Sequence, residues 1–347
     1  MADYRSTGKE LRKSPKGMIA GLIALTLLGI SGYGVYRAAM GMRSLDALPV
    51  PGSDTEISVP EFSEIGTEPQ NRIIFGSETV PASDIHSGML LLVNRDYATE
   101  DITEGLVTLF GKKTESYGLK DTSLQLLEEP LSAFNAMADA FHAENNGAKL
   151  LVTTAYRTKE EQRKIYTSSL SNKSADGSVT AAMAGFSDYE TGCSVSVTVM
   201  RDGQYLDLGG ADCEKERAWF DAKAAKYGFI LRYPADKTEI TGFPYESGHF
   251  RYVGPVHAIY MHGTGLCLEE YLKKLREYAY TGSSSSHLTA PGADNKAYEV
   301  LFVPLEHPEE ATAEIPVPAD APYQISGNNI DGFVITVDTG EAFTASE

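Results

Sequence analysis

The chain has 347 residues, which is enough for one substantial domain with appended segments or for two ordinary domains. Hydrophobic residues make up 42% and charged residues 22%, a globular composition that excludes wholesale disorder. The formal net charge of −18 repels phosphate backbones and argues against nucleic acid as a partner. A halophilic habit or simple solubility explains the same charge equally well.

The first notable segment, residues 18–36, carries no charge. A helix of this length spans about 28 Å, close to the thickness of a bilayer's hydrocarbon core. We therefore expect a cytoplasmic tail at residues 1–17 and a transmembrane anchor at residues 18–37. A cleaved signal peptide is the alternative, because small residues follow at 31–34, but the apolar run is long for one and no clean Ala-x-Ala site follows it.

The charges around this segment predict its orientation. Five basic residues precede it, and only Arg37 and Arg43 follow closely; the five are Arg5, Lys9, Arg12, Lys13 and Lys16. Because positive residues stay on the cytoplasmic side, we expect a single-pass plasma-membrane protein with most of the chain outside. Residues 38–87 are rich in Pro, Ser, Glu and Asp and predict an extracytoplasmic stalk.

From Gly88 onward the pattern predicts packed helices and strands. Expected strands lie at 89–93, 149–154, 194–200 and 229–233, with a turn at 201–203 between the last two. Expected helices begin after Pro130 and at the capping box Thr158–Glu161, and others cover 214–227 and 267–280. No regular βαβ repeat connects them, which favours an α+β domain.

The last part of the chain follows a serine-rich linker at 283–286. Residues 298–305 and 332–338 have the pattern of strands, and a turn at Asn328–Asn329 precedes the second. We therefore expect residues 287–347 to form an acidic β extension that packs on the core or on a partner.

Three cysteines, Cys193, Cys213 and Cys267, are too few and too widely spaced for a disulfide framework or a zinc ribbon. One pair could form a bridge outside the cell and would leave one thiol over. The strand-like surroundings of Cys193 favour a small buried residue instead.

Four segments, in order, resemble those of the zinc-dependent VanY-type D-alanyl-D-alanine carboxypeptidases of peptidase family M15. They are Leu92–Arg95; Thr154–Thr158 with Gln162; Ser187–Ser196, similar to Ser-x-His-x-x-Gly-x-Ala/Ser-x-Asp; and Tyr227–Gly254, ending like Glu-Pro-Trp-His-x-Arg-Tyr-Val-Gly. The resemblance covers residues 88–281 and implies a single core domain of the hedgehog/D,D-peptidase-like fold.

The resemblance also implies which residues would carry zinc chemistry, and two of them are replaced. The family holds zinc with a histidine and an aspartate of the third segment and a histidine of the fourth, and a glutamate activates the bound water. In this chain Tyr189 and Ser196 stand at the first two positions, while His249 and Glu246 are retained. A phenol titrating near 10 and a neutral hydroxyl are poor zinc donors, so we expect no bound metal, and zinc only if the chain is active.

Other residues near the lost positions do not have the spacing of replacement ligands. His257 and His262 are separated by a five-residue step, whereas two ligands on one helix face are four apart. Asp202 and Asp207 fit a hairpin, and strand alternation turns Cys193 away from Ser196. The family's Pro and Trp are also replaced, by Ser247 and Gly248, which predicts a reshaped wall.

The resemblance places Arg157, Gln162 and Ser187 beside the substrate, with Arg157 facing negative charge there. A structural ion pair is the alternative for Arg157. Whether the chain is an enzyme stays open. The favoured hypothesis is an inactive carboxypeptidase-like protein that binds peptidoglycan stem peptide or an envelope protein. The alternatives are an active metallo-D,D-carboxypeptidase with an unusual ligand set, and a purely structural role.

Overall fold

The computed structural model describes residues 73–172, 181–282 and 287–344. All of these residues belong to one compact unit. The expected tail and anchor, and the expected stalk as far as residue 72, lie outside the described residues. Within the described ranges, no helix has the length and apolar character needed to cross a membrane.

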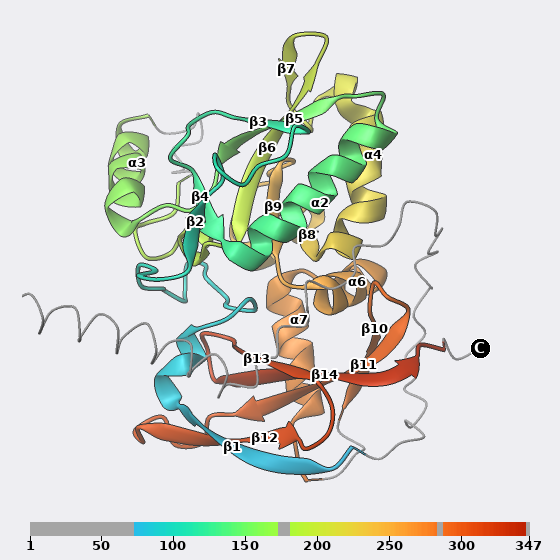
Figure 1. The fold of residues 1–347 in the computed structure, drawn as a ribbon. Coiled ribbons are helices and arrows are strands. Elements are labelled where there is room, and N and C mark those ends of the chain that lie inside the picture. The colour runs from blue at the N-terminus through green and yellow to red at the C-terminus, as the bar shows by residue number, and fades with distance from the viewer. Residues whose placement is uncertain (1–72, 173–180, 283–286, 345–347) are drawn as a thin grey trace, which may run out of the picture. The chain divides into compact units, whose positions relative to one another are not determined.

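This unit is built on a mixed six-stranded sheet with strand order β3-β5-β6-β9-β8, and β7 pairs with β6 (Figure 1). Only β3 and β5 run parallel; the other neighbours are antiparallel. The strands are β3 (Tyr117–Leu119), β5 (Lys149–Thr154), β6 (Ser194–Arg201), β7 (Gln204–Leu206), β8 (Phe229–Leu231) and β9 (His249–Tyr252). A short ladder of β2 (Leu106–Thr108) and β4 (Gln125–Leu127) lies beside it.

One face of this sheet is covered by α2 (Glu128–Glu144) and α4 (Glu214–Lys223). Helix α4 continues directly into the 3-10 helix η4 (Ala224–Tyr227). The helix predicted after Pro130 is α2, and its apolar side chains are buried there: Leu131, Phe134, Met137, Ala138 and Phe141. From β6, alternate residues Val195, Val197 and Val199 join the same core. Because side chains alternate along a strand, Ser194 and Ser196 must point to the opposite face.

The predicted helix at Thr158 is α3 (Lys159–Ser171), and its capping box is confirmed: Thr158 Oγ1 accepts from Glu161 N, and Thr158 N donates to Glu161 Oε2 at 2.9 Å. The turn after β6 is also confirmed, since Asp202 and Gly203 both have positive φ angles, 52° and 75°. Gln162 is the buried residue of α3. The helix therefore lies mostly exposed at the margin of the unit.

The expected strand at 89–93 is wrong. These residues form an irregular segment in which Leu90–Val93 are buried. Their backbone groups bond outside any sheet, because Leu92 N donates to Asn328 O at 3.1 Å and Arg251 Nη2 donates to Leu91 O at 2.9 Å. An apolar run predicts burial correctly here but not a strand.

The C-terminal residues form a second sheet, antiparallel, in the order β10-β11-β14-β13. Its strands are β10 (Leu288–Pro291), β11 (Lys296–Pro304), β13 (Tyr323–Gly327) and β14 (Gly332–Ala342). The two strands predicted from the sequence are confirmed as β11 and β14. A separate ladder joins β12 (Thr312–Pro318) to β1 (Phe75–Pro81). Residues 75–81, expected in the stalk, are thus paired with the C-terminal extension, and the 3-10 helix η1 (Ala82–His86) follows them.

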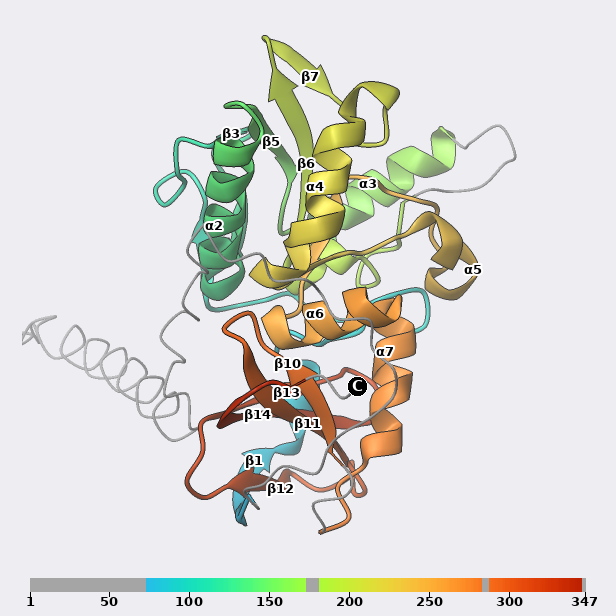
Figure 2. The ribbon, with the colours of Figure 1, turned by 90° about the vertical axis from the view of Figure 1, so that its right-hand side faces the viewer.

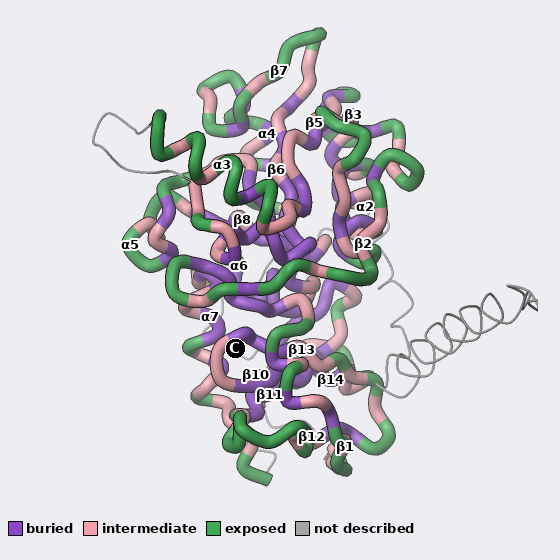
Figure 3. Tube along the Cα trace, turned by 90° about the vertical axis from the view of Figure 1, so that its left-hand side faces the viewer, coloured by how far each residue is buried: buried purple, intermediate pink, exposed green. Residues whose placement is uncertain are grey.

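Helices α6 (Pro255–Thr264) and α7 (Leu268–Leu275) join the two sheets into one packed body (Figure 2). One face of α7 is buried against residues of β10, β11 and β14; it consists of Leu268, Tyr271, Leu272 and Leu275. Figure 3 shows the buried trace continuing from the six-stranded sheet through α6 into these strands. The 3-10 helix η6 (Arg276–Tyr278) ends the predicted helix 267–280.

The turn at Asn328–Asn329 fastens the C-terminal sheet to the segment before β2. Asn329 has a positive φ of 63° and its Nδ2 donates to Leu92 O and Ala98 O, at 2.8 and 2.9 Å. The Asn328 Oδ1 accepts three main-chain N–H bonds from residues 330–332. The extension is therefore an integral part of the folded unit.

Candidate functional site

The residues singled out by the family resemblance gather on the face of the six-stranded sheet away from α2 and α4. In the β6–β9 ladder, Ser196 lies directly opposite His249, and Ser194 lies opposite Arg251. Directly opposed residues of antiparallel strands share a face. Tyr189 reaches them from the 3-10 helix η2 (Asp188–Thr191), and Arg157 from the loop after β5.

The two replaced positions contact each other. The Tyr189 hydroxyl and the Ser196 Oγ share a hydrogen bond of 2.5 Å, in which either group can donate. The Tyr189 ring also stacks on the His249 imidazole, with centroids 4.3 Å apart and an interplanar angle of 19°. Burial, followed by the negative charge of Glu246, raises the pKa of Tyr189 well above its ordinary value. The phenol therefore stays protonated and serves as a hydrogen-bonding group.

Both ring nitrogens of His249 face carboxylates. Its Nδ1 lies 2.9 Å from Glu246 Oε2, and its Nε2 lies 3.3 Å from Asp188 Oδ2. Burial by itself would lower the pKa of His249, but the hydrogen bonds and charges of Asp188 and Glu246 outweigh it and raise the pKa. Two carboxylate acceptors favour a doubly protonated ring, which has no lone pair for a metal.

Asp188 is the centre of a buried ion network that sequence reasoning missed. Its Oδ1 accepts from Arg251 Nη1 at 2.5 Å and from Arg232 Nε at 3.2 Å, and its Oδ2 also accepts from Ser194. Burial would raise the pKa of Asp188, yet Arg251, His249 and Arg232 hold it well below its usual range. Arg232 also binds both carboxylate oxygens of Glu269, at 3.0 and 2.8 Å.

A signal for this network is present in the sequence. Arg232 and Arg251 stand in or beside short apolar strands, and both are fully buried in the structure. A buried guanidinium needs a carboxylate partner, so these two arginines predict at least one buried acid nearby. Asp188, next to the aligned Tyr189, is that acid.

Arg157 is partly exposed, and its guanidinium lies over the face of the Tyr189 ring. Its Cζ lies 4.3 Å from the centre of the Tyr189 ring. Its Nη1 donates to Gln162 Oε1 at 3.1 Å, and its Nη2 donates to Thr154 Oγ1 at 3.3 Å. Burial lowers the pKa of Arg157, and the electrostatic influence of Tyr189 and Glu246 opposes that shift. Neither hydrogen bond is to an acid, so the guanidinium keeps capacity for an anion.

The other expected substrate contacts lie deeper. Gln162 is buried, and its amide bridges Arg157 to the carbonyl of Ala182, which its Nε2 reaches at 2.7 Å. Ser187 is also buried, and its main-chain N–H donates to Glu190 Oε2 at 2.9 Å. Gln162 supports the loops around Arg157 through its side chain and Ser187 through its main chain, and their role in binding substrate stays a prediction.

The donor set does not fit zinc. Across the described residues, no group of three His, Cys, Asp or Glu side chains is arranged to hold a metal ion. The alternative donors are engaged elsewhere: His257 Nδ1 lies 2.7 Å from the Tyr271 hydroxyl and its Nε2 lies 3.0 Å from Thr336 Oγ1. Cys193 is buried in the core on the other face and, like the other two cysteines, is a free thiol.

Backbone atoms of β6 fill the space next to Gly248, the residue before His249. A Cβ on Gly248 would lie 2.3 Å from the carbonyl oxygen of Val197. No side chain fits at position 248 unless β6 moves, so the family's tryptophan has no room here. The neighbouring Ser247 instead donates to Asp207 Oδ1 at 2.7 Å.

Comparisons with known proteins agree with this arrangement of segments. The family model described as VanY, D-alanyl-D-alanine carboxypeptidase, matches residues 123–255. A D-alanyl-D-alanine carboxypeptidase of Enterococcus faecium is 32% identical over 278 residues, which cover 78% of this chain and 81% of the relative. The putative carboxypeptidase YodJ of Bacillus subtilis (strain 168) is 30% identical over 230 residues, 65% of this chain and 82% of the relative.

The similarity reaches beyond the expected core. The solved structure of the vancomycin resistance D,D-dipeptidase VanXYg, in complex with a D-Ala-D-Ala phosphinate analogue, has a TM-score of 0.63 at 27% identity and covers 76% of this chain and 99% of that one. Residues 88–281 are little more than half of this chain, so this likeness and the Enterococcus faecium alignment both extend past them. The chain belongs to the VanY family of D-alanyl-D-alanine carboxypeptidases.

Proposed function

We propose that this chain is a non-catalytic member of its family, which binds the peptidoglycan stem peptide without hydrolysing it. The observation that carries the proposal is the engagement of His249: both of its ring nitrogens face carboxylates, at 2.9 and 3.3 Å. With Tyr189 bonded to Ser196, no aligned ligand position offers a donor suited to zinc. Without a metal-bound water, Glu246 has nothing to activate.

Arg157 is the group that would hold the ligand. It is a cation beside an aromatic ring, and its guanidinium donates hydrogen bonds to the neutral side chains of Gln162 and Thr154. A peptide that ends in a free D-Ala carboxylate supplies the matching anion, and partial exclusion of water strengthens the pairing. The protein's net charge of −18 makes such a cationic spot a local exception.

The similarity to carboxypeptidases supports a second candidate, an active metallo-D,D-carboxypeptidase with an unusual ligand set. This alternative requires His249 to give up one carboxylate and two further donors to approach it. A docking role for the C-terminal extension, with the site around Tyr189 as a remnant, is the third.

Anchoring belongs to the same proposal. Residues 18–37 would cross the plasma membrane once and hold the folded unit outside the cell, next to the peptidoglycan. Protease added to intact cells, or to spheroplasts of a cell with an outer membrane, should then remove nearly everything after about residue 44. Protection of the C-terminal region would show the opposite orientation.

The full-length protein, mixed with a pentapeptide ending in D-Ala-D-Ala, tests the function directly. We expect no release of D-alanine, together with weak binding in the high-micromolar to millimolar range, worth about 4 to 6 kcal/mol, by titration calorimetry. Amidation of the peptide's terminus should weaken binding, and so should Arg157→Ala, whereas Arg157→Lys should retain part of it. Turnover at a rate typical of the family, or equal binding of acid and amide, would contradict the proposal.

A further inference from the structure

One stretch of chain connects the C-terminal extension with the cation of the candidate site. Residues 94–102, which we call the connecting segment, precede β2 and pass the C-terminal sheet (Figure 1). Asn329 Nδ2 donates to the carbonyl of Ala98 in this segment at 2.9 Å and to that of Leu92, just before it, at 2.8 Å. The Asn329 Oδ1 lies 2.6 Å from His86 Nδ1, so both polar atoms of the amide are engaged. Asn329 is buried, and a buried amide that loses its partners costs free energy.

The middle of the connecting segment holds a loop beside the site. Thr99 is buried, and its N–H donates to the carbonyl of Gly185 at 2.7 Å. Three residues before Gly185, the carbonyl of Ala182 accepts from Gln162 Nε2 at 2.7 Å. Gln162 Oε1 in turn accepts from Arg157 Nη1 at 3.1 Å. A continuous series of contacts therefore leads from the C-terminal sheet to the guanidinium.

The end of the connecting segment contacts residues on either side of Arg157 in the sequence. Ile102 N donates to the Tyr156 hydroxyl at 3.2 Å. The N–H of Lys159, the first residue of α3, donates to Asp101 Oδ1 at 2.7 Å. These two bonds restrain the stretch of chain from which the Arg157 side chain extends.

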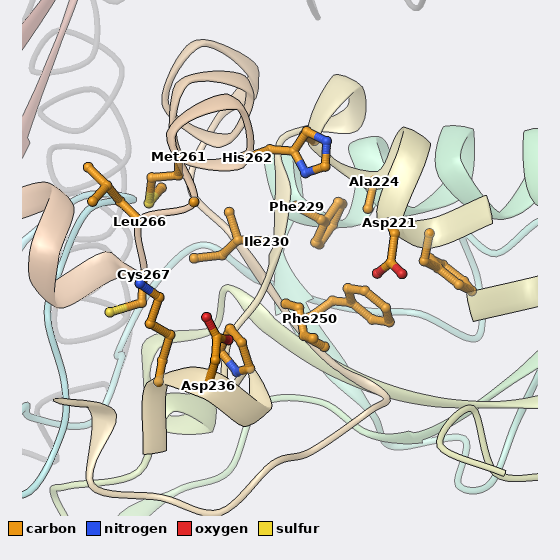
Figure 4. A pocket seen from close by; sticks show the side chains of 16 residues that line it. Asp221, Ala224, Phe229, Ile230, Asp236, Phe250, Met261, His262, Leu266 and Cys267 are labelled. Atoms are coloured by element: carbon orange, nitrogen blue, oxygen red, sulfur yellow. The ribbon is translucent and has the colours of Figure 1, made fainter. Parts of the chain in front are cut away.

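These contacts lie apart from the cavity of about 210 Å³ beside β8 (Figure 4). That cavity is lined in part by core side chains, among them Phe229 and Phe250, which pack on the face of the sheet covered by α4. None of its lining residues belongs to the connecting segment or to residues 181–190. A change at Asn329 would therefore reach Arg157 without involving this cavity.

We propose that Asn329 is a positioning residue for Arg157, and that the C-terminal extension thereby forms part of the ligand-binding site. Asn329 holds the connecting segment at Ala98, and the segment restrains Arg157 through the Gly185 loop and through the residues that flank Arg157. Packed elements joined by hydrogen bonds can couple two positions in this way. The consequence for peptide binding rests on the proposed function, whereas the position of the guanidinium can be measured without a ligand.

Two variants of the full-length protein remove the Asn329 donor. Asn329→Asp keeps the shape of the side chain but turns an oxygen towards the carbonyls of Leu92 and Ala98. Asn329→Gly removes the side chain without burying a charge, and glycine suits the positive φ of 63°. The same two changes at Asn295 are the matched controls, because Asn295 has a φ of 62° and is exposed in the turn between β10 and β11.

Hydrogen exchange and NMR of the ligand-free proteins report on the segment and on Arg157. Three amide protons should exchange about tenfold faster, or more, in both Asn329 variants: those of Thr99, Ile102 and Lys159. The Arg157 Nε–H and the Gln162 side-chain amide signals should shift. Both Asn295 variants should resemble the unmodified protein. Unchanged exchange or unchanged Arg157 signals in the Asn329 variants would overturn the proposal.

Peptide binding separates positioning from general stability. Both Asn329 variants should bind the pentapeptide ending in D-Ala-D-Ala about fivefold more weakly, or less, by NMR titration. Val337→Ala removes buried methyl groups from β14, so it should lower the thermal midpoint and leave both the affinity and the Arg157 signals unchanged. Undiminished affinity in the Asn329 variants, or an equal loss in Val337→Ala, would refute the positioning role. If the unmodified protein binds no peptide, the proposed function fails, and the Arg157 signals alone decide whether Asn329 positions this side chain.

Discussion

The Tyr189 hydroxyl and the Ser196 Oγ share a hydrogen bond of 2.5 Å at the two positions where the family resemblance implies zinc ligands. The two replacements are thus matched to each other. Each hydroxyl satisfies the other in a place where an isolated one would lack a partner, and the Tyr189 ring covers His249 at 4.3 Å.

This pairing predicts a measurable coupling. Tyr189→Phe and Ser196→Ala should each lower the free energy of unfolding, and the double variant should be less destabilised than the sum of the two by about 0.5–1.5 kcal/mol. Urea unfolding of the unmodified protein, the two single variants and the double variant gives the four free energies of this double-mutant cycle. Strict additivity would show that the hydrogen bond contributes nothing to stability.

Restoring the aligned ligands should restore metal binding before it restores chemistry. Tyr189→His combined with Ser196→Asp supplies an imidazole and a carboxylate beside His249, so the zinc content of the purified protein should rise. Release of D-alanine should remain undetectable, because Gly248 leaves no room for the family's tryptophan wall. Each single variant is the control and should bind less zinc than the pair. Family-like turnover by the double variant would show that the wall is dispensable.

Asp188 should be the most sensitive position of the site. Asp188→Asn removes the charge between Arg232 and Arg251, both fully buried, and leaves two guanidinium groups without that carboxylate. Breaking a buried ion pair from one side costs about 3–5 kcal/mol of unfolding free energy. Asp320→Asn, at an exposed position, should change stability by less than about 0.5 kcal/mol. A loss below about 1 kcal/mol for Asp188→Asn would mean that the network is not a structural centre.

His257 should make the fold sensitive to acid. Burial lowers the pKa of His257 to about 3, and its two nitrogens face Tyr271 of α7 and Thr336 of β14. The unfolded chain binds a proton at this position near pH 6.5 and the folded chain does not, so stability falls as the pH drops from about 6.5 towards 3. At pH 5 this group alone should lower the unfolding free energy by about 2 kcal/mol relative to pH 8.

His257→Gln isolates that contribution, because glutamine keeps hydrogen-bonding capacity and does not titrate. The stability difference between the two proteins should shrink by about 2 kcal/mol between pH 8 and pH 5. A difference that stays constant with pH would show that His257 is not held neutral in the folded protein.

Local sequence patterns predicted most helices and strands of the core, because these elements depend on residues close together in the sequence. The pattern of residues 194–200 predicts a strand, and in the structure Val195 and Val197 join the core while Ser194 and Ser196 lie on the opposite face. The capping box at Thr158 depends only on neighbours in sequence, so it was predicted too. These elements carry the aligned residues to one face of the sheet.

Features that depend on distant partners were missed. Phe75–Pro81 shows no sustained apolar period, and it becomes a strand only by pairing with Thr312–Pro318, more than two hundred residues away. Leu90–Val93 is apolar and buried beneath the turn at Asn329. Its carbonyl groups accept hydrogen bonds from the side chains of Asn329 and Arg251 and not from a neighbouring strand. Asp188 escaped notice because alignment with the family draws attention to its neighbour Tyr189.

The zinc content of the full-length protein tests the central claim most directly. The protein should be purified without chelators, dialysed against zinc-free buffer, and measured by elemental analysis alongside an active VanY-type carboxypeptidase treated identically. Because His249 is engaged by Asp188 and Glu246, and Tyr189 by Ser196, we predict well under one zinc per chain. Stoichiometric zinc that survives dialysis would contradict the account, since it would require these contacts to open and an unforeseen set of donors to assemble.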